Sequence, residues 1–127
     1  MADVYSSMCP SRAVLELIAG KWTLLIVPLL ARGPERNNAL LRKIDGISQK
    51  VLSQTLRDLE ANGLVMRIDH HTVPPHVDYR LTELGHSLSR ALEPVDRWAE
   101  ANLPRIEQAK ARAATTPGPA PDTDAAD

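Results

Sequence analysis

The fold is decided by residues 38–85: NALLRKI (38–44), DGIS (45–48), QKVLSQTLRDLEANG (49–63), LVMRID (64–69) and HVDYRLTELG (76–85). This stretch predicts a short helix, a tight glycine-containing turn, a second helix and a β-hairpin. A polar-faced second helix after such a turn is how proteins lay side chains into a DNA major groove, and the hairpin is what a winged variant adds. The expected fold class is therefore mainly α with a small β-hairpin (α+β), a winged helix-turn-helix, and the expected function is DNA binding.

The second helix of this stretch should have two distinct faces. At 100° per residue, one face is apolar and comprises Val51, Leu52, Thr55, Leu56 and Leu59. The opposite face is polar and comprises Lys50, Ser53, Gln54 and Arg57. Ser48 is the expected N-cap, and Asn62-Gly63 should end the helix.

Three further helices are expected around this stretch. A helix should begin at Cys9-Pro10 with an apolar face, and residues 21–31 should form a central buried helix kinked at Pro28. A long amphipathic helix should start near Thr82 and be kinked or divided at two internal prolines. The expected organisation is a flexible N-terminal arm (1–8), one domain (9–113) and a disordered acidic tail (114–127).

The charge of the chain is unevenly distributed. The 127 residues carry 15 basic and 16 acidic side chains, but residues 32–57 hold six basic against two acidic ones. A local basic surface of this kind is what contact with phosphates requires. No apolar run reaches the ~20 residues of a membrane span. No secretory signal is evident and the single cysteine cannot form an internal disulfide, so a cytoplasmic location is the expectation.

With these residues placed, the chain resembles the HxlR family of bacterial regulators, relatives of the MarR-type winged helices. The resemblance covers about residues 9–100 and rests on the ordered set Cys9-Pro10, Gly20-Lys21-Trp22, residues 46–50 (GISQK), 56–60 (LRDLE), 63–65 (GLV) and 74–85 (PPHVDYRLTELG). It implies a homodimer that binds DNA to repress or activate genes, with the first and last helices packed across the two-fold axis. The chain departs from the family pattern at Asn37, where a Phe is usual, and at Pro28.

The candidate DNA contacts lie on the second helix, at its start and on the hairpin. Arg and Lys pair with guanine, Gln with adenine, and Ser with either, although an ordinary solvated helix face has the same composition. The candidates are Asn38, Ser48, Gln49, Lys50, Ser53, Gln54, Arg57, Arg67, His70, His71 and Arg80. The operator is expected to be double-stranded and near-palindromic, matching a two-fold dimer.

Cys9 raises the question of regulation. It is placed at the start of a helix, where the dipole favours the reactive thiolate. The resembled family includes redox and electrophile sensors that use a cysteine here, so a thiol oxidant or an electrophile is the favoured effector. The alternatives are a half-buried structural thiol and control by a small ligand with Cys9 uninvolved.

Other functions have weaker support in the sequence. No carboxylate-and-histidine spacing supports a metal site at His70, His71 and His76, so no metal and no cofactor is expected. Trp22, Tyr79 and Trp98 could line an effector pocket, but core and dimer packing is favoured. No nucleophile elbow, phosphate loop or metalloprotease motif indicates an enzyme, and nothing supports a catalytic pair of Cys9 and His86. The rival from another class is a winged helix used only for protein interaction.

Overall fold

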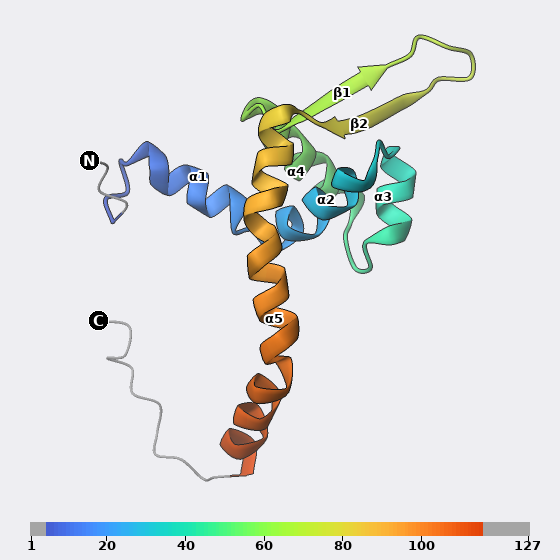
Figure 1. The fold of residues 1–127 in the computed structure, drawn as a ribbon. Helices are drawn as coiled ribbons and strands as arrows, with labels where there is room; N and C mark the ends of the chain where they lie inside the picture. Colours follow the sequence, from blue (N-terminus) through green and yellow to red (C-terminus); the bar gives the residue numbers. More distant parts are fainter. Residues whose placement is uncertain (1–4, 116–127) are drawn as a thin grey trace. The chain divides into compact units, whose positions relative to one another are not determined.

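The computed structural model describes residues 5–115, and its helices and hairpin confirm the predicted fold class (Figure 1). The order is α1 (Pro10–Ile18), α2 (Lys21–Arg32), α3 (Asn37–Lys43), α4 (Gln49–Ala61), β1 (Val65–Asp69), β2 (Val77–Leu81) and α5 (Glu83–Thr115). The chain divides into two compact units, one ending at Leu92 and one beginning at Glu93. All elements up to the start of α5 belong to the first unit.

The core of the first unit forms where α2, α4 and the hairpin meet. As expected, α2 is central, with Ile26, Val27 and Leu30 almost fully buried. The predicted apolar face of α4 supplies Leu52, Leu56 and Leu59, each no more than 2% exposed. Burial of these branched side chains is the main free-energy source that holds α4 in place. The helix α2 runs through Pro28 without ending there.

The hairpin is a two-stranded antiparallel sheet that projects from the helices in Figure 1. Its register pairs Val65 with Leu81 and Asp69 with Val77, close to the predicted strand ends. The segment before α3 adds an isolated bridge, because Glu35 and Tyr79 exchange both backbone hydrogen bonds, at 3.1 and 2.8 Å. The hairpin is therefore fixed to the start of the helix-turn-helix by main-chain bonds.

The junction between the hairpin and α5 is also held by hydrogen bonds. The Thr82 N–H donates to the Leu64 carbonyl at 3.0 Å, and the Thr82 hydroxyl accepts from the Gly85 N–H at 3.0 Å. The hydroxyl thus caps the first turn of α5. A Cβ added at Gly85 would overlap the carbonyl oxygen of Leu64, so the strand and the helix approach closely here.

Two expectations about the ends of the domain need revision. Pro94 and Pro104 do not divide the last helix, because both lie inside one continuous α5. That helix ends at Thr115, two residues past residue 113, where the domain was expected to end, and the remaining tail residues lie outside the described part. At the other end, residues 5–8 form turns, and residues 1–4 of the expected arm also lie outside it.

Several apolar side chains of both units remain exposed. In α1 no residue is buried, and Val14 and Leu15 are each about half exposed. In the second unit, Val95, Trp98 and Leu103 of α5 are 51–61% exposed. Among the described helices none is long and apolar enough to cross a membrane alone; only the bent pair α1 and α2 meets the length and composition of a span.

Candidate DNA-binding interface

The turn before α4 is built as the sequence predicts. Ser48 is the N-cap, and its hydroxyl accepts a hydrogen bond from the Val51 N–H at 3.1 Å. Gly46 has a φ of 86°, a conformation that glycine adopts without steric cost. Burial of the apolar face of α4 leaves Lys50, Gln54 and Arg57 exposed on its other side. The helix is thus anchored along one face and open to solvent along the other.

The start of α4 is tied to α3 by a side-chain network that the sequence analysis missed. The Asn37 amide donates to the Gln49 carbonyl oxygen at 2.6 Å, and the Gln49 amide donates back to Asn37 at 3.0 Å. Gln49 also donates to the Ser53 hydroxyl at 2.7 Å. Asn37, the departure from the family pattern, therefore links the two helices. Gln49 and Ser53, two of the predicted DNA contacts, are hydrogen-bonded to each other.

The other predicted DNA contacts on the helix-turn-helix differ in whether their side chains already have a hydrogen-bond or ion-pair partner. Gln54 donates to the Asp58 carboxylate at 2.9 Å, one turn further along α4. Lys50 and Arg57 are exposed and have no ion-pair partner among the described residues. Asn38 is exposed on α3. The side chains most available for a ligand on α4 are therefore the two cations.

The hairpin places its two predicted arginines on opposite faces. Arg67 pairs across the strands with Tyr79, whereas Arg80 pairs with Met66. Because neighbouring residues of a strand alternate between faces, Arg67 and Arg80 point to different sides. Arg80 also donates from Nε to the Asp78 carboxylate at 3.0 Å, whereas Arg67 has no ion-pair partner within the described residues. The structure does not bring these two side chains together as one contact surface.

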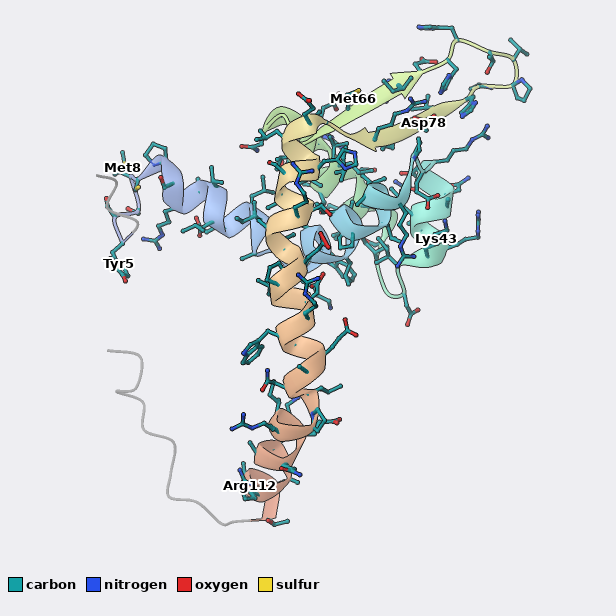
Figure 2. All side chains as sticks on the ribbon, viewed as in Figure 1. Tyr5, Met8, Lys43, Met66, Asp78 and Arg112 are labelled. Carbon is teal, nitrogen blue, oxygen red and sulfur yellow. The ribbon has the colours of Figure 1, made fainter. Side chains whose placement is uncertain are left out.

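Two of the three hairpin histidines meet at Asp78, which lies on the hairpin in Figure 2. The Asp78 Oδ2 atom lies 2.8 Å from His70 Nε2 and 3.5 Å from His76 Nε2. The hydrogen bond from Arg80 lowers the pKa of Asp78, helped by that from His70, against the raising effect of burial. Partial desolvation and the neighbouring charge of Arg36 lower the pKa of His76. The spacing in the sequence indicates no carboxylate beside these histidines, whereas the register of the hairpin brings Asp78 to them.

His71 lies apart from this cluster. Its side chain is 85% exposed, and its φ of 53° is in the left-handed region. Its backbone N–H donates to the Asp69 carboxylate at 2.8 Å, and this bond is the main reason that the pKa of Asp69 is lowered. Among the predicted wing residues, His71 is the one most open to solvent at the loop.

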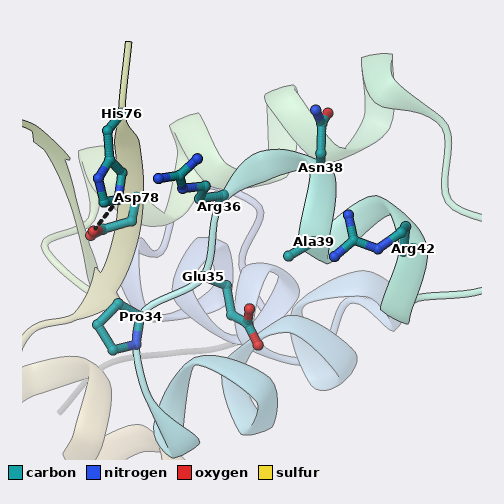
Figure 3. Close-up of a pocket in the computed structure, with 8 residues that line it drawn as sticks. All are labelled: Pro34, Glu35, Arg36, Asn38, Ala39, Arg42, His76 and Asp78. Carbon is teal, nitrogen blue, oxygen red and sulfur yellow. Dashed lines mark ion pairs between the residues drawn. The ribbon is translucent and has the colours of Figure 1, made fainter. Parts of the chain in front are cut away.

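A hollow of about 700 Å³ separates α3 from β2, and its walls are partly basic (Figure 3). Arg36 and Arg42 line it together with Asn38, and Arg36 points toward His76 and Asp78. Neither arginine has an ion-pair partner among the described residues, whereas Lys43 is paired with Glu35. Both arginines belong to the basic stretch of residues 32–57, and this excess of positive charge is the sequence signal that could have added them to the candidate contacts.

Cys9 is the N-cap residue of α1 and belongs to the first unit. In the sequence it lies well before the candidate DNA contacts. It is the only cysteine of the chain, is partly exposed, and is free. Its backbone accepts from Arg12 N–H at 3.1 Å, which begins the helix. The predicted placement at a helix start is confirmed. Of the three aromatic side chains considered for an effector pocket, Trp22 and Tyr79 pack against the core, whereas Trp98 is 61% exposed.

Comparisons with known proteins agree on the kind of protein. The HTH-type transcriptional regulator YtfH of Escherichia coli (strain K12) is 41% identical over 104 residues, which is 82% of each chain. The solved transcriptional regulator ytfH from Salmonella typhimurium superposes with a TM-score of 0.79 at 37% identity, covering 87% of this chain and 98% of that one. The redox regulator HypR in its reduced form gives a TM-score of 0.72 at 36% identity, covering 78% and 98%.

The described fold, the exposed basic helix and these relatives identify a transcriptional regulator with a DNA-binding helix-turn-helix rather than an enzyme. The family model for the HxlR-like helix-turn-helix matches residues 17–107, most of the chain. This protein belongs to the HxlR-like helix-turn-helix family.

Proposed function

We propose that the protein binds a near-palindromic operator as a homodimer, with α4 of each subunit in a major groove. The observation that carries the proposal is the pair of exposed cations Lys50 and Arg57 on the solvent face of α4, which no acidic side chain of the described residues neutralises. They are seven residues apart, about 10 Å along a helix axis and on nearly the same side of it. Such a spacing suits contacts to bases or phosphates along one groove.

The remaining candidates on the helix-turn-helix take supporting roles in this proposal. Gln49 holds the start of α4 against α3 through Asn37, and Ser53 accepts a hydrogen bond from Gln49, so neither is free to read bases without breaking those bonds. Ser48 keeps the first turn of α4 formed. Arg36 and Arg42 flank the hollow beside α3, where a phosphate of the DNA backbone would find two donors. The wing contributes through the exposed Arg67 and His71 more than through Arg80, because the Arg80 side chain is already bonded to Asp78.

Homodimerisation is supported by the apolar side chains that each unit leaves in solvent. These are Val14 and Leu15 on α1, and Val95, Trp98 and Leu103 in the second unit, each about half exposed or more. Apolar surface of this kind is usually covered by a partner. A two-fold dimer would present two α4 helices to half-sites about one helical turn apart.

The test of DNA binding is fluorescence anisotropy with a duplex from upstream of the protein's own gene. Arg57→Ala should weaken specific binding by about 1–3 kcal/mol and reduce the salt dependence of the affinity by about one phosphate contact. Arg90→Ala is the matched control, because Arg90 is also exposed and has no ion-pair partner among residues 5–115, but lies on α5. Equal affinities of the two variants would refute the assignment of Arg57. Absence of any DNA affinity at low salt would favour the protein-interaction module instead.

We further propose that Cys9 makes this binding responsive to thiol oxidation. Cys9 begins α1, the helix with the exposed apolar face, and a regulator of similar fold, HypR, is a redox regulator. Oxidation by diamide would join two Cys9 thiols of a dimer in a disulfide, or one thiol and a small thiol in a mixed disulfide, while the oxidant takes up both electrons.

Cys9→Ser separates thiol control from control by a small ligand. Loss of the diamide response in the variant, with DNA affinity retained without oxidant, would support the thiol. A response that persists in Cys9→Ser would exclude it. Non-reducing electrophoresis of the wild-type protein distinguishes a cross-linked dimer from a mixed disulfide.

A further inference from the structure

The tip of the hairpin gathers three metal-ligating side chains. His70 follows β1, His76 precedes β2, and Asp78 lies two residues after His76. One ligand atom from each of the three lies within 4.8 Å of the other two. Neither the family match nor the relatives described above assign a metal to these residues.

The backbone holds the two histidines in place. The His70 N–H donates to the His76 carbonyl at 2.9 Å, one pair beyond the last pair of the sheet, so the two residues face each other across the hairpin. Their rings lie 4.1 Å apart between centroids and are tilted by 31°. His76 and Asp78 are separated by one residue of an extended segment, which puts both side chains on the same face. The three groups therefore converge because of the register and not because two flexible side chains happen to meet.

The donor set and its spacing fit a borderline divalent ion. Imidazole nitrogen and carboxylate oxygen bind Zn²⁺ at about 2.0–2.2 Å, and tetrahedral ligands around such an ion lie roughly 3.3 Å from one another. The Asp78 Oδ2 atom is 2.8 Å from His70 Nε2 and 3.5 Å from His76 Nε2. The first distance is shorter and the second longer than that ligand separation. Three protein ligands leave the fourth position of a tetrahedron for water or another ligand.

The second carboxylate oxygen of Asp78 is already oriented. Arg80 Nε donates to Oδ1 at 3.0 Å, while both histidines approach Oδ2. Ligating carboxylates in metal sites commonly have such an outer hydrogen-bond partner, which fixes their direction. The positive charges of Arg80 and of Arg36, which lines the neighbouring hollow, oppose the binding of a cation here. Arg36 is exposed and unpaired within the described part of the chain, so it can turn into solvent when the ion binds.

We propose that His70, His76 and Asp78 form a binding site for one Zn²⁺ per chain at the tip of the wing. The ion would replace the hydrogen bond between His70 and Asp78 and join the ends of β1 and β2 through its ligands. It would also add two positive charges to the hairpin. Binding of the ion does not depend on whether the protein binds DNA.

The test is a titration of the full-length, untagged protein with Co²⁺, after removal of metal with a chelator. All variants carry Cys9→Ser, so that no thiol can bind the ion. A saturable visible absorption band at one Co²⁺ per chain, displaced by Zn²⁺, is expected from four-coordinate Co²⁺. Removal of a group that only hydrogen-bonds a metal ligand lowers metal affinity by about 10–100-fold. Removal of a ligand itself, by His76→Gln, should therefore lower the Co²⁺ affinity by at least about 100-fold.

His71→Asn is the matched control, because His71 lies in the same loop, is 85% exposed on its side chain, and has a positive φ that Asn tolerates. It should bind Co²⁺ like the parent. Histidine NMR resonances give a second readout: Zn²⁺ should shift the rings of His70 and His76 and leave those of His71 and His86 in place. Equal affinities of His76→Gln and His71→Asn, or the absence of saturable binding with unshifted His70 and His76 resonances, would overturn the proposal.

Discussion

Replacing Gly85 by alanine should destabilise the protein, against the usual effect of this change in a helix. Gly85 lies in the first turn of α5, where alanine would ordinarily gain about 0.5–1 kcal/mol. Here the added Cβ would overlap the carbonyl oxygen of Leu64 and touch the Leu81 side chain. The oxygen cannot move freely, because it accepts the Thr82 N–H at 3.0 Å.

The expected magnitude follows from these opposing terms. Overpacking in a well-packed region costs about 1–3 kcal/mol. Weakening of the Thr82–Leu64 hydrogen bond adds about 0.5–1.5 kcal/mol. After subtraction of the helix-propensity gain, the free energy of unfolding of Gly85→Ala should fall by about 0.5–4 kcal/mol.

Urea denaturation followed by circular dichroism measures this free energy, at one fixed protein concentration because a dimer's stability depends on it. Ser89→Ala is the matched control, one turn further along α5, where the side chain has no hydrogen bond within the described part of the chain and the change should be neutral or slightly stabilising. The reasoning is refuted if Gly85→Ala is as stable as the wild-type protein or more stable.

Two other consequences of the structure can be measured directly. A double-mutant cycle of Asn37→Ala and Gln49→Ala, measured by urea denaturation, should give a coupling energy of about 0.5–1.5 kcal/mol for the exposed amide pair, and a coupling near zero would show that the pair does not persist in solution. Trp98→Glu should shift the protein toward monomer in analytical ultracentrifugation, because it puts a charge on an apolar side chain that is 61% exposed in the single chain. An unchanged sedimentation coefficient would exclude Trp98 from the dimer interface.

The fold could be predicted from the sequence because its local signals agree with one another. The apolar spacing of α4, the Ser48 cap and the Asn62-Gly63 end all point to the same helix, and the structure has it at Gln49–Ala61. The last helix was harder, because Pro94 and Pro104 predict a break by local rules. Proline removes one hydrogen-bond donor, but a helix can continue past it, as α5 does.

The candidate site could be predicted only in part, because side-chain partners depend on tertiary proximity. Helical spacing put Gln49, Ser53 and Arg57 together as polar residues, but it could not show that Gln49 is hydrogen-bonded to both Asn37 and Ser53. Likewise, the eight-residue spacing between His70 and Asp78 carries no local signal. Only the register of the hairpin, with Ile68 opposite Asp78, brings them together.

The main-chain bridge between Glu35 and Tyr79 has a consequence for how the protein would contact DNA. It joins the hairpin to the segment that begins α3, while the amides of Asn37 and Gln49 join α3 to α4. The helix that carries Lys50 and Arg57 and the hairpin that carries Arg67 are thus connected through α3 by hydrogen bonds, and not by packing alone. Hydrogen bonds depend steeply on distance and direction, so a displacement of α3 strains both links. Any event that moves the hairpin, including an ion bound at its tip, would therefore act on the position of α4 through these two links.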